Sequence, residues 1–373
     1  MRTVGYALIA GFLVACGGGD SVERTALTQL PISYAAVGGG IDCDNNPLFS
    51  SPAPQDGHQV VRLNGETLLL HDLSEGVPLG TYLSGIVCNE DGRLLASSSC
   101  STNGCSATGM YEKLDAASSW QPLGLPDGAN GIYGSWAGLD GTAWLLVNVP
   151  TAQGADFTFF SKTAAGPWQK VLSNGSYNVE SPQVSKTHDI IFGSRLDNKI
   201  HGKRRNQAEA VSPLFRCPTD YIDQDCTSLT NNVITTDAIV TSPYSDDIYV
   251  VLRSPTDRSK LLRLPADVPF PIDYKSITPI EVLPGRWDRL GFDRDGRVYI
   301  HFASDVTLDY PPYAAEESVI AHLEPGGTKW HIDGRVLENG SIFSVSPKRI
   351  YSASYQIQSG GFFFPDPIYV GDF

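Results

Sequence analysis

Charged residues are scarce in this sequence. They make up 18% of the 373 residues, whereas about 25% is usual in soluble domains. The charge is also one-sided, because 41 acidic side chains stand against 27 Lys and Arg, giving a formal net charge of −14. An acidic surface repels phosphate backbones. We therefore expect no nucleic-acid partner, and the excess of carboxylates favours a soluble surface.

A second absence concerns the N-terminus, where the apolar run Val4–Val14 has only eleven residues. A membrane-spanning helix needs about 20 residues, so this run does not predict a transmembrane segment. It follows Arg2 and has the length of a signal-peptide core. The run ends in Leu-Val-Ala-Cys at residues 13–16, and this ending resembles the lipobox of bacterial lipoproteins. The resemblance implies cleavage after Ala15 and lipidation of Cys16; the alternative is an ordinary cleaved leader followed by a chance cysteine.

The residue after Cys16 determines the expected location. It is Gly17, not the aspartate that, in lipoproteins, is associated with retention at the inner membrane. We therefore expect an exported protein that is lipid-anchored to the outer membrane, on its periplasmic or cell-surface side. The glycines that follow suit a flexible tether. The expected organisation is a lipoprotein signal peptide over 1–15, a tether over 16–24 and one folded domain over 25–373.

Several motifs with a known chemistry are missing as well. The sequence has no Cys-x-x-Cys pair, no histidines at metalloprotease spacing, no Gly-x-Ser-x-Gly elbow and no phosphate-binding glycine loop. These are the patterns that carry zinc sites, serine nucleophiles and nucleotide phosphates. The sequence therefore predicts no metal, no cofactor and no catalytic residue.

One stretch, Phe292–Ile300 (FDRDGRVYI), begins like a calcium loop, with Asp293 and Asp295 two residues apart. A calcium loop continues with further oxygen ligands and a glutamate at its twelfth position. Here Arg297 and an alternating apolar run follow instead. Glycine accepts the positive φ that tight turns need, so Asp-Gly between apolar runs is typical of a hairpin. The stretch predicts a turn between two strands.

Cysteine is sparse but even in number once Cys16 is set aside, since seven cysteines then become six. An exported protein folds where disulfides form. Six cysteines allow fifteen connectivities, and two pairs lie close enough in sequence to clasp loops. These pairs are Cys100 with Cys105 and Cys217 with Cys226, which by elimination leaves Cys43 with Cys88.

Glycine and proline, in contrast, are plentiful, at 37 and 25 residues. Short runs rich in Val, Ile, Tyr, Phe and Trp between them indicate strands. A turn followed by a strand recurs, and the residue that enters the strand serves as a marker. Successive markers lie roughly fifty residues apart, with one longer interval, which is the repeat length of a β-propeller. The markers are Pro47, Arg93, Thr142, Asp189, Asp247, Arg297 and Arg349.

Four strand-like runs can be traced in the repeats around Asp140 and Asp295, and four antiparallel strands make a propeller blade. The last repeat lacks its fourth strand, whereas a spare run, Ala26–Leu30, precedes the first repeat. We predict an all-β, seven-bladed β-propeller of four-stranded antiparallel blades. An N-terminal strand would complete the last blade and remove the exposed edges of an open ring.

Three segments carry a family resemblance. Asp115–Trp120 keeps an aspartate five residues before a tryptophan, Ser161–Trp168 keeps the serine and the tryptophan, and Glu324–Trp330 keeps a glycine and the tryptophan. They resemble the Ser-x-Asp-x-Gly-x-Thr-Trp motif of Asp-box (BNR) propellers, which include the sialidases, although no copy is intact. The resemblance implies the fold, and it makes a sialidase-like hydrolase an alternative function. Phe215–Pro218 also has the Phe-Arg-x-Pro form of sialidases.

Three loops exceed the length that a hairpin needs, and loops on one propeller face commonly form binding sites. Exposed aromatic side chains often anchor such contacts; the alternative is that they fold back into small cores. A basic cluster, Lys203–Arg205, is expected to be a solvated loop face; the alternative is contact with an anionic headgroup or a partner. The candidate partner-binding residues are Tyr221, Asp223 and Asp225, then Tyr310 and Tyr313, then Phe362, Phe363 and Phe364 in the loop 355–367.

These observations together favour a monomeric, lipid-anchored binding or scaffold module without a catalytic step. Its expected partner is a protein or glycan of the cell envelope. Two alternatives remain open at this point: a sialidase-like glycoside hydrolase or lyase on the same propeller, and a structural surface lipoprotein without a ligand. A hydrolase would need arginines and carboxylates that converge on one mouth of the central channel.

Overall fold

The computed structural model describes residues 28–372 with interruptions. The interruptions are residues 35, 53–56, 101–108, 116, 153, 174–178, 195, 198, 208–210, 217–238, 253–259, 265, 267, 274–276, 282–285, 304–317, 337–340, 347–348, 354 and 359–361. Within the described part, all regular structure is β-strand. None of these residues forms a helix long and apolar enough to cross a membrane. The predicted all-β class is confirmed.

Four sheets contain four strands each, every strand antiparallel to the next. The first is β10 (Ile132–Ala137), β11 (Ala143–Thr151), β12 (Gly154–Lys162) and β13 (Gln169–Ser173). The second is β14 (Val179–Val184), β15 (Ile190–Ser194), β16 (Lys199–Lys203) and β17 (Ser212–Pro213). The third is β19 (Ile239–Thr241), β20 (Ile248–Leu252), β21 (Lys260–Leu264) and β23 (Thr278–Pro279), and the fourth is β24 (Arg286–Phe292), β25 (Val298–Ala303), β26 (Ser318–Leu323) and β27 (His331–Val336).

A larger, eight-stranded sheet consists of two antiparallel quartets. They meet where β2 and β6 run parallel, with Gly40 opposite Ile86. A separate short parallel pair joins β18 (Phe215–Arg216) to β22 (Ile272–Asp273). The quartets are β2 (Gly38–Ile41), β3 (Pro47–Ser50), β4 (Val60–Leu63) and β5 (Leu70–Asp72), then β6 (Thr81–Cys88), β7 (Leu94–Cys100), β8 (Met110–Lys113) and β9 (Gln121–Pro122).

The last sheet joins the two ends of the described chain. Its order is β1 (Thr28–Tyr34), β31 (Phe362–Asp372), β29 (Arg349–Ala353) and β28 (Ser341–Ser346). β1 is antiparallel to β31, with Thr28 opposite Val370. The predicted pairing of an N-terminal strand with the last strand of the chain is therefore confirmed.

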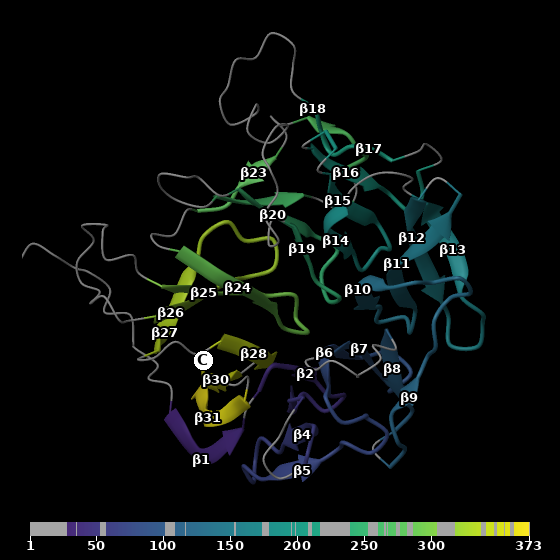
Figure 1. Cartoon of the computed structure of the whole chain (residues 1–373). Helices are drawn as coiled ribbons and strands as arrows, with labels where there is room; N and C mark the ends of the chain where they lie inside the picture. Colours follow the sequence, from purple (N-terminus) through teal and green to yellow (C-terminus); the bar gives the residue numbers. More distant parts are fainter. Residues whose placement is uncertain are drawn as a thin grey trace, which may run out of the picture.

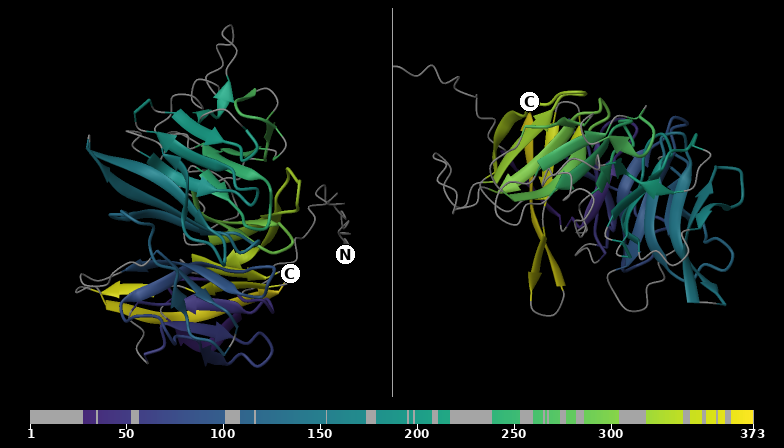
Figure 2. Two further views of the ribbon diagram at one scale, coloured as in Figure 1. Left: turned by 90° about the vertical axis from the view of Figure 1, so that its right-hand side faces the viewer. Right: turned by 90° about the horizontal axis from the view of Figure 1, so that it is seen from above.

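One predicted loop is in fact a hairpin. β30 (Tyr355–Gln358) pairs with the start of β31, so that Gln358 lies opposite Phe362 and Ile357 opposite Phe363. Figure 2 shows this hairpin extending away from the rest of the molecule. The segment is therefore an antiparallel ladder and not an irregular loop.

The sheets follow one another around a common centre, with β2, β6, β10, β14, β19, β24 and β28 innermost (Figure 1). Neighbouring inner strands contact one another, as β10 does β14 and β28 does β2. Every sequence marker either begins the second strand of its repeat, as Pro47 and Arg349 do, or directly precedes it, as Arg93 and Arg297 do. The repeat spacing therefore located the second strands correctly.

The hydrophobic core lies between neighbouring sheets. Trp144 and Phe159 of one sheet pack against Val184, Ile190 and Phe192 of the next. Both Phe159 and Phe192 are fully buried, and each such side chain contributes about 1.5 to 3 kcal/mol. Each sheet therefore depends on its neighbours for stability.

Three buried or half-buried tryptophans repeat one contact between neighbouring sheets. The indole Nε1 of Trp120 donates to the carbonyl oxygen of Leu73 at 2.9 Å, that of Trp168 to Gly124 at 3.2 Å and that of Trp330 to Glu281 at 2.9 Å. The residues before Trp120 form a turn in which Asp115 Oδ1 accepts backbone N–H groups. A buried indole N–H needs such an acceptor, so this recurring bond fixes the outer strands to the preceding sheet.

The expectation of a solvated basic cluster at residues 203–205 is wrong for Arg204. This side chain is 7% exposed, its Nη1 lies 2.6 Å from Asp189 Oδ2, and its Nε donates to the carbonyl oxygen of Val268. Its guanidinium also lies 4.1 Å from the centre of the Phe270 ring. A buried cation is tolerated where its donors are paired, so Arg204 links two sheets instead of facing solvent.

Candidate functional site

The site is built on the turns that join each inner strand to the second strand. In four of them a side-chain oxygen accepts the backbone N–H four residues later. The pairs are Asp42 from Asn46 at 2.8 Å, Asn89 from Arg93 at 2.8 Å, Ser185 from Asp189 at 3.0 Å and Asp293 from Arg297 at 2.9 Å. Short polar side chains are favoured in turns because they satisfy backbone donors in this way.

The stretch Phe292–Ile300 forms one of these turns. Asp293 is fully buried, and its Oδ2 also accepts a hydrogen bond from the Tyr299 hydroxyl at 3.0 Å. The predicted hairpin is confirmed, because the carboxylate of Asp293 closes the turn between β24 and β25. Among the residues that the structure describes, no group of three or more His, Cys, Asp or Glu side chains is placed to hold a metal ion.

Two of these turns have a non-glycine residue with a positive φ. The third position after the start of the turn is glycine at 92, 141 and 296, but Asn45, with φ 64°, in the β2–β3 turn and His188, with φ 65°, in the β14–β15 turn. Asparagine adopts this conformation more readily than histidine does. A side chain in this conformation costs roughly 1 to 2 kcal/mol. Strain of this kind is common at functional sites, so His188 is a candidate for a specific role.

The turns contact one another in a closed series, here called the turn circuit. Its first contact is the disulfide between Cys43, in the β2–β3 turn, and Cys88 at the end of β6. The backbone N–H of Glu90 then donates to the carbonyl oxygen of Leu139 at 2.8 Å. From the β10–β11 turn, Asp140 Oδ2 lies 3.2 Å from His188 Nε2. The pairing of Cys43 with Cys88, predicted by elimination from the sequence, is confirmed by this disulfide.

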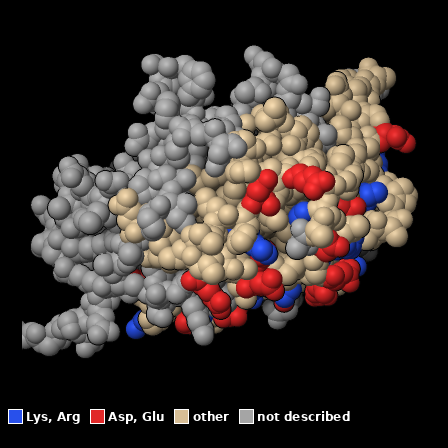
Figure 3. Space-filling model, turned by 90° about the horizontal axis from the view of Figure 1, so that it is seen from below, with Lys and Arg blue, Asp and Glu red and all other residues tan. Residues whose placement is uncertain are grey.

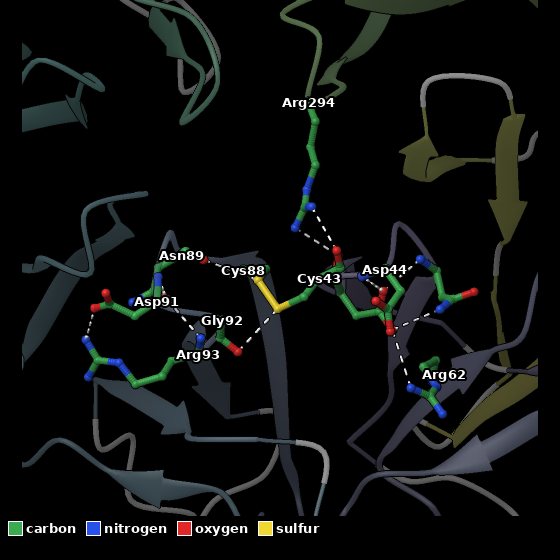
Figure 4. The surroundings of a disulfide bond; sticks show 11 residues. Cys43, Asp44, Arg62, Cys88, Asn89, Asp91, Gly92, Arg93 and Arg294 are labelled. Atoms are coloured by element: carbon green, nitrogen blue, oxygen red, sulfur yellow. Dashed lines mark hydrogen bonds and ion pairs between the residues drawn. A yellow bond between two sulfur atoms is a disulfide. The ribbon is translucent and has the colours of Figure 1, made fainter.

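The other half of the turn circuit returns to the β2–β3 turn. Lys186 Nζ lies 3.6 Å from Asp246 Oδ1. Tyr244 is hydrogen-bonded to Arg294, and burial raises the pKa of its phenol against the opposing effect of the guanidinium. Arg294 donates from Nη1 to the carbonyl oxygen of Cys43 at 3.0 Å and from Nη2 to that of Asp42 at 2.9 Å. Figure 4 shows Arg294 reaching across to the disulfide. Six turns are thus linked around one mouth of the ring.

A cavity of about 190 Å³ lies beside this circuit. It is lined by the ends of the inner strands β6, β10 and β14, by residues at and just after β19, and by Trp144 of β11. Glycine, alanine, valine and proline supply six of the fifteen lining residues, and serine, threonine, glutamine and two tryptophans, Trp136 and Trp144, supply most of the others. Lys186 and His188 also line it. The described lining contains no arginine, carboxylate or tyrosine.

The polar groups of the lining are largely engaged. The Ser97 hydroxyl donates to the carbonyl oxygen of Ser135 at 3.0 Å, and the Thr241 hydroxyl contacts that of Val184 at 3.0 Å. Ser185 Oγ accepts the backbone N–H of Asp189. The first two bonds join neighbouring strands around the cavity, and the third closes the β14–β15 turn. Among the described lining residues, the buried indole N–H of Trp144 has no hydrogen-bond partner and stays available to a ligand.

A second polar cluster lies on the β24–β27 sheet, away from the cavity lining. His322 Nδ1 lies 2.6 Å from Asp333 Oδ1, and His322 Nε2 lies 3.3 Å from Glu324 Oε1. Burial opposes protonation of His322, but the two carboxylates outweigh it and raise the pKa of the imidazole. Arg297 binds Glu324 through Nε at 3.0 Å and holds the pKa of that carboxyl below its usual value. The cluster joins β26 to β27 and to the turn at Arg297.

The charged side chains of the molecule are mixed in sign on the edge shown in Figure 3. Acidic residues there are interspersed with Lys and Arg, and no large area of one sign is visible. Mixed surfaces of this kind favour solubility without steering a charged ligand. The described residues in this view therefore form no docking surface of a single charge sign.

Most residues predicted as partner contacts lie outside the described parts of the chain. This applies to Cys16, Cys105, Cys217, Tyr221, Asp223, Asp225, Cys226, Tyr310 and Tyr313. Cys100 ends β7, and Phe362, Phe363 and Phe364 lie in β31, but their side chains are also outside the description. The roles given to all of these residues stay predictions.

The cavity residues were missed by sequence reasoning. Trp136 and Trp144 read as ordinary strand residues, and the other lining residues are small and scattered from Gly85 to Pro243. Among the lining residues, His188 stands out by its positive φ, and no pattern in the sequence predicts this conformation. The turns, in contrast, were visible as recurring Asp-Gly and related pairs.

No family model matches the chain, and no curated protein matches it either. Solved structures do. A catalytically inactive variant of virginiamycin B lyase from Staphylococcus aureus with quinupristin is 11% identical, with a TM-score of 0.53 over 94% of this chain and 99% of that one. YCF48 bound to D1 peptide is 12% identical, with a TM-score of 0.52 over 94% and 96%. A streptogramin B lyase is 12% identical, with a TM-score of 0.51 over 94% and 98%.

At these identities the likeness concerns the fold alone. The matched proteins include lyases and a peptide-bound protein, so one architecture carries different functions. The chain is an all-β protein whose solved structural neighbours are folds of the β-propeller type.

Proposed function

We propose that this protein is an exported, lipid-anchored seven-bladed β-propeller that acts as a non-catalytic binding or scaffold module at the cell envelope. Its partner in this proposal is a protein or a glycan of the envelope, and Cys16 carries the lipid. The folded domain spans residues 25–373, after a leader over 1–15 and a tether over 16–24. The chain works as a monomer and needs no cofactor.

The arrangement of the sheets supports the blade count. Two quartets, four four-stranded sheets and the last sheet give seven units around the centre (Figure 1). The repeated indole bond of Trp120, Trp168 and Trp330 supports the Asp-box interpretation. All three tryptophans end the segments that resemble this motif, and each binds the preceding unit in the same way.

The observation that carries the binding function is the lining of the cavity at the turn circuit. A sialidase-like site needs several arginines for a substrate carboxylate and acidic or tyrosine side chains for the chemistry. The described lining has none of these. Phe215, which begins the Phe-Arg-x-Pro segment, is buried in a hydrophobic cluster, so this segment is explained by packing. A small pocket with tryptophan walls is instead typical of a binding site.

The proposal is tested with the full-length protein in its own envelope. Cross-linking followed by mass spectrometry is expected to give one dominant partner with the wild-type chain. The partner should be weakened by Ala137→Leu, which narrows the cavity, and not by Ala155→Leu on the exposed part of β12. Identical cross-links from both variants would contradict a role for the cavity.

Two further assays separate the alternatives. Turnover of fluorogenic sialosides or other glycosides by the purified protein, lost on changing a cavity residue, would establish the hydrolase instead. Metabolic labelling with an alkyne fatty acid tests the anchor: the wild-type chain should be labelled, and Cys16→Ser should lose both the label and the membrane association. A labelled Cys16→Ser chain would contradict the assignment of the anchor.

A further inference from the structure

The size of the cavity limits what it can hold. At about 190 Å³ it is slightly larger than an engineered 150 Å³ cavity that binds benzene. One substituted six-membered ring fits this space, and two linked sugar residues do not. The occupant is therefore a single small group, either free or projecting from a larger partner.

The charges at the rim already have partners within the protein. Lys186 lies 3.6 Å from Asp246, and His188 lies 3.2 Å from Asp140. An anionic ligand would have to displace Asp246 or Asp140, and a cationic ligand would find no carboxylate in the lining. A neutral occupant has no such competition, so the rim favours an uncharged group.

The hydrogen-bonding groups argue against a sugar. Ser97 and Thr241 contact the backbone carbonyl oxygens of Ser135 and Val184, and Ser185 accepts a backbone N–H. A pyranose carries several hydroxyls, and each hydroxyl left without a partner on leaving water costs about 1 to 3 kcal/mol. The buried indole N–H of Trp144 has no hydrogen-bond partner and can donate to one hydroxyl. The other hydroxyls of a pyranose would depend on groups such as those of Ser97 and Thr241, which already bond within the protein.

The apolar walls suit a flat ring. Trp136 and Trp144 lie directly opposite each other on β10 and β11, and Val87 and Val184 complete the apolar lining. Contacts to neighbouring rings hold both indoles in place: Trp136 stacks on Phe159 at 6.1 Å, and Trp144 lies 5.2 Å from His188. Aromatic pairs add about 0.5 to 1.5 kcal/mol to the burial of apolar area.

We propose that this cavity receives one neutral aromatic ring, supplied by a Phe, Tyr or Trp side chain of a partner or by a free aromatic molecule. The proposal rests on the binding function proposed above for the same site and defines the chemistry that the site recognises. His188, strained at its positive φ, holds the wall of Trp144 and the rim at Asp140 in place.

The experiment uses the indole N–H signals of the full-length protein, which has six tryptophans. The signals of Trp136 and Trp144 are assigned with the variants Trp136→Phe and Trp144→Phe. Addition of p-cresol is expected to shift these two signals and leave the other four unchanged, with affinity in the millimolar range because the ligand has few atoms. Methyl β-glucoside and acetate are expected to shift neither.

Two variants test the location. Ala137→Leu should weaken p-cresol binding at least tenfold, whereas the exposed Ala155→Leu should not. If Ala137→Leu fails to fold, as judged by circular dichroism, Val184→Ala provides the second test: a larger cavity should bind 2-naphthol more tightly than the wild-type chain does. Shifts of the two signals by the glucoside or acetate but not by p-cresol would overturn the proposal, and so would unchanged binding in both variants.

The source of the ring is read from a third titration. If N-acetyl-tyrosinamide binds as p-cresol does, the ring comes from a partner side chain; binding of p-cresol alone indicates a free aromatic molecule. A captured partner without ring binding would contradict this inference and leave the proposed function standing. Ring binding without any partner would support the inference and contradict the proposed function.

Discussion

Two neighbouring pairs of inner strands in this ring meet in opposite ways. Between β2 and β6 the backbones touch: a Cβ on Gly40 would lie 2.1 Å from the carbonyl oxygen of Ile86, and these two residues pair in parallel. Between β10 and β14 stand the side chains of Trp136, Gln183 and Val184, and a cavity lies beside them. The contact between β2 and β6 is here called the closed seam, and the disulfide between Cys43 and Cys88 fixes it further. The junction of β10 and β14, beside the cavity, is here called the open seam.

The difference teaches that side-chain size on the inner strands decides what the centre of the ring can do. The first three residues of β2, Gly38, Gly39 and Gly40, have no side chain, so the backbones of β2 and β6 can approach closely. On the other side β10 and β14 also contact each other, but the larger side chains of Trp136 and Val184 line a cavity beside them. The closed seam therefore serves stability, and the open seam can serve binding.

The largest expected effect comes from breaking the closed seam at its centre. Gly40→Val should lower the free energy of unfolding by more than about 4 kcal/mol, because the new side chain has no space between two backbones. Urea unfolding followed by circular dichroism measures this. The matched control is Gly166→Val, where the nearest atom is a side-chain hydroxyl, that of Thr163. Equal midpoints for the two variants would contradict the close approach of β2 and β6.

The next effect comes from removing the covalent link. The double change Cys43→Ser and Cys88→Ser opens a loop with a sequence separation of 45 residues, which should cost about 4 kcal/mol of unfolding free energy. The open seam should be untouched, so the indole signals of Trp136 and Trp144 should keep their positions. Movement of these signals would show that the two seams are coupled.

A smaller loss of stability is expected from changing Arg294, which links the β24–β25 turn to the β2–β3 turn at the closed seam. Arg294→Met keeps the length of the side chain but removes the bonds to the carbonyl oxygens of Asp42 and Cys43. Hydrogen bonds from charged groups contribute about 1.5 to 3 kcal/mol, and a loss in that range should appear in thermal unfolding. Arg205→Met, on an exposed side chain, serves as the control. A melting temperature equal to that of the control would contradict a stabilising role for the bonds of Arg294 to Asp42 and Cys43.

The smallest effect is expected at His322, which lies outside both seams and serves as a reference for them. Because Asp333 and Glu324 raise the pKa of His322 in the folded state, the folded chain binds this proton more tightly than the unfolded chain. The resulting stability is complete below the unfolded pKa of about 6.5 and is lost as pH rises through the folded pKa. His322→Gln should remove this part of the pH dependence of urea unfolding without moving the signals of Trp136. An unchanged pH profile would contradict the role of the carboxylates.

The sequence predicted the parts of this molecule that depend on local chemistry. Asp293 and Gly296 report a turn because the carboxylate accepts a backbone N–H and glycine accepts a positive φ. The spacing of the markers located the second strands, since each repeat buries a run such as Ile190–Ser194. The pairing of Thr28 with the last strand followed from counting strands.

The sequence could not predict features that depend on contacts between distant segments. Several inner strands carry a bulge, for example between Ile132 and Gly134 and between Glu180 and Gln183, and an extra residue interrupts the alternation that marks a half-buried strand. Arg204 looked like a surface cation because its partner Val268 is 64 residues away. No sequence motif marks the cavity, because its lining residues come from several strands that lie far apart in the sequence.

The pairing of β1 with β31 also has a mechanical consequence. Any pull on the chain before Thr28 enters the molecule at the ladder between Thr28 and Val370. The strand that bears this load is held on one side by β31, and β31 is held by β29. Leu30 and Tyr34 at the same time pack against Phe49 of the first quartet. A pull at this end is therefore shared between the first and the last units of the chain, at the joint where the two ends of the ring meet.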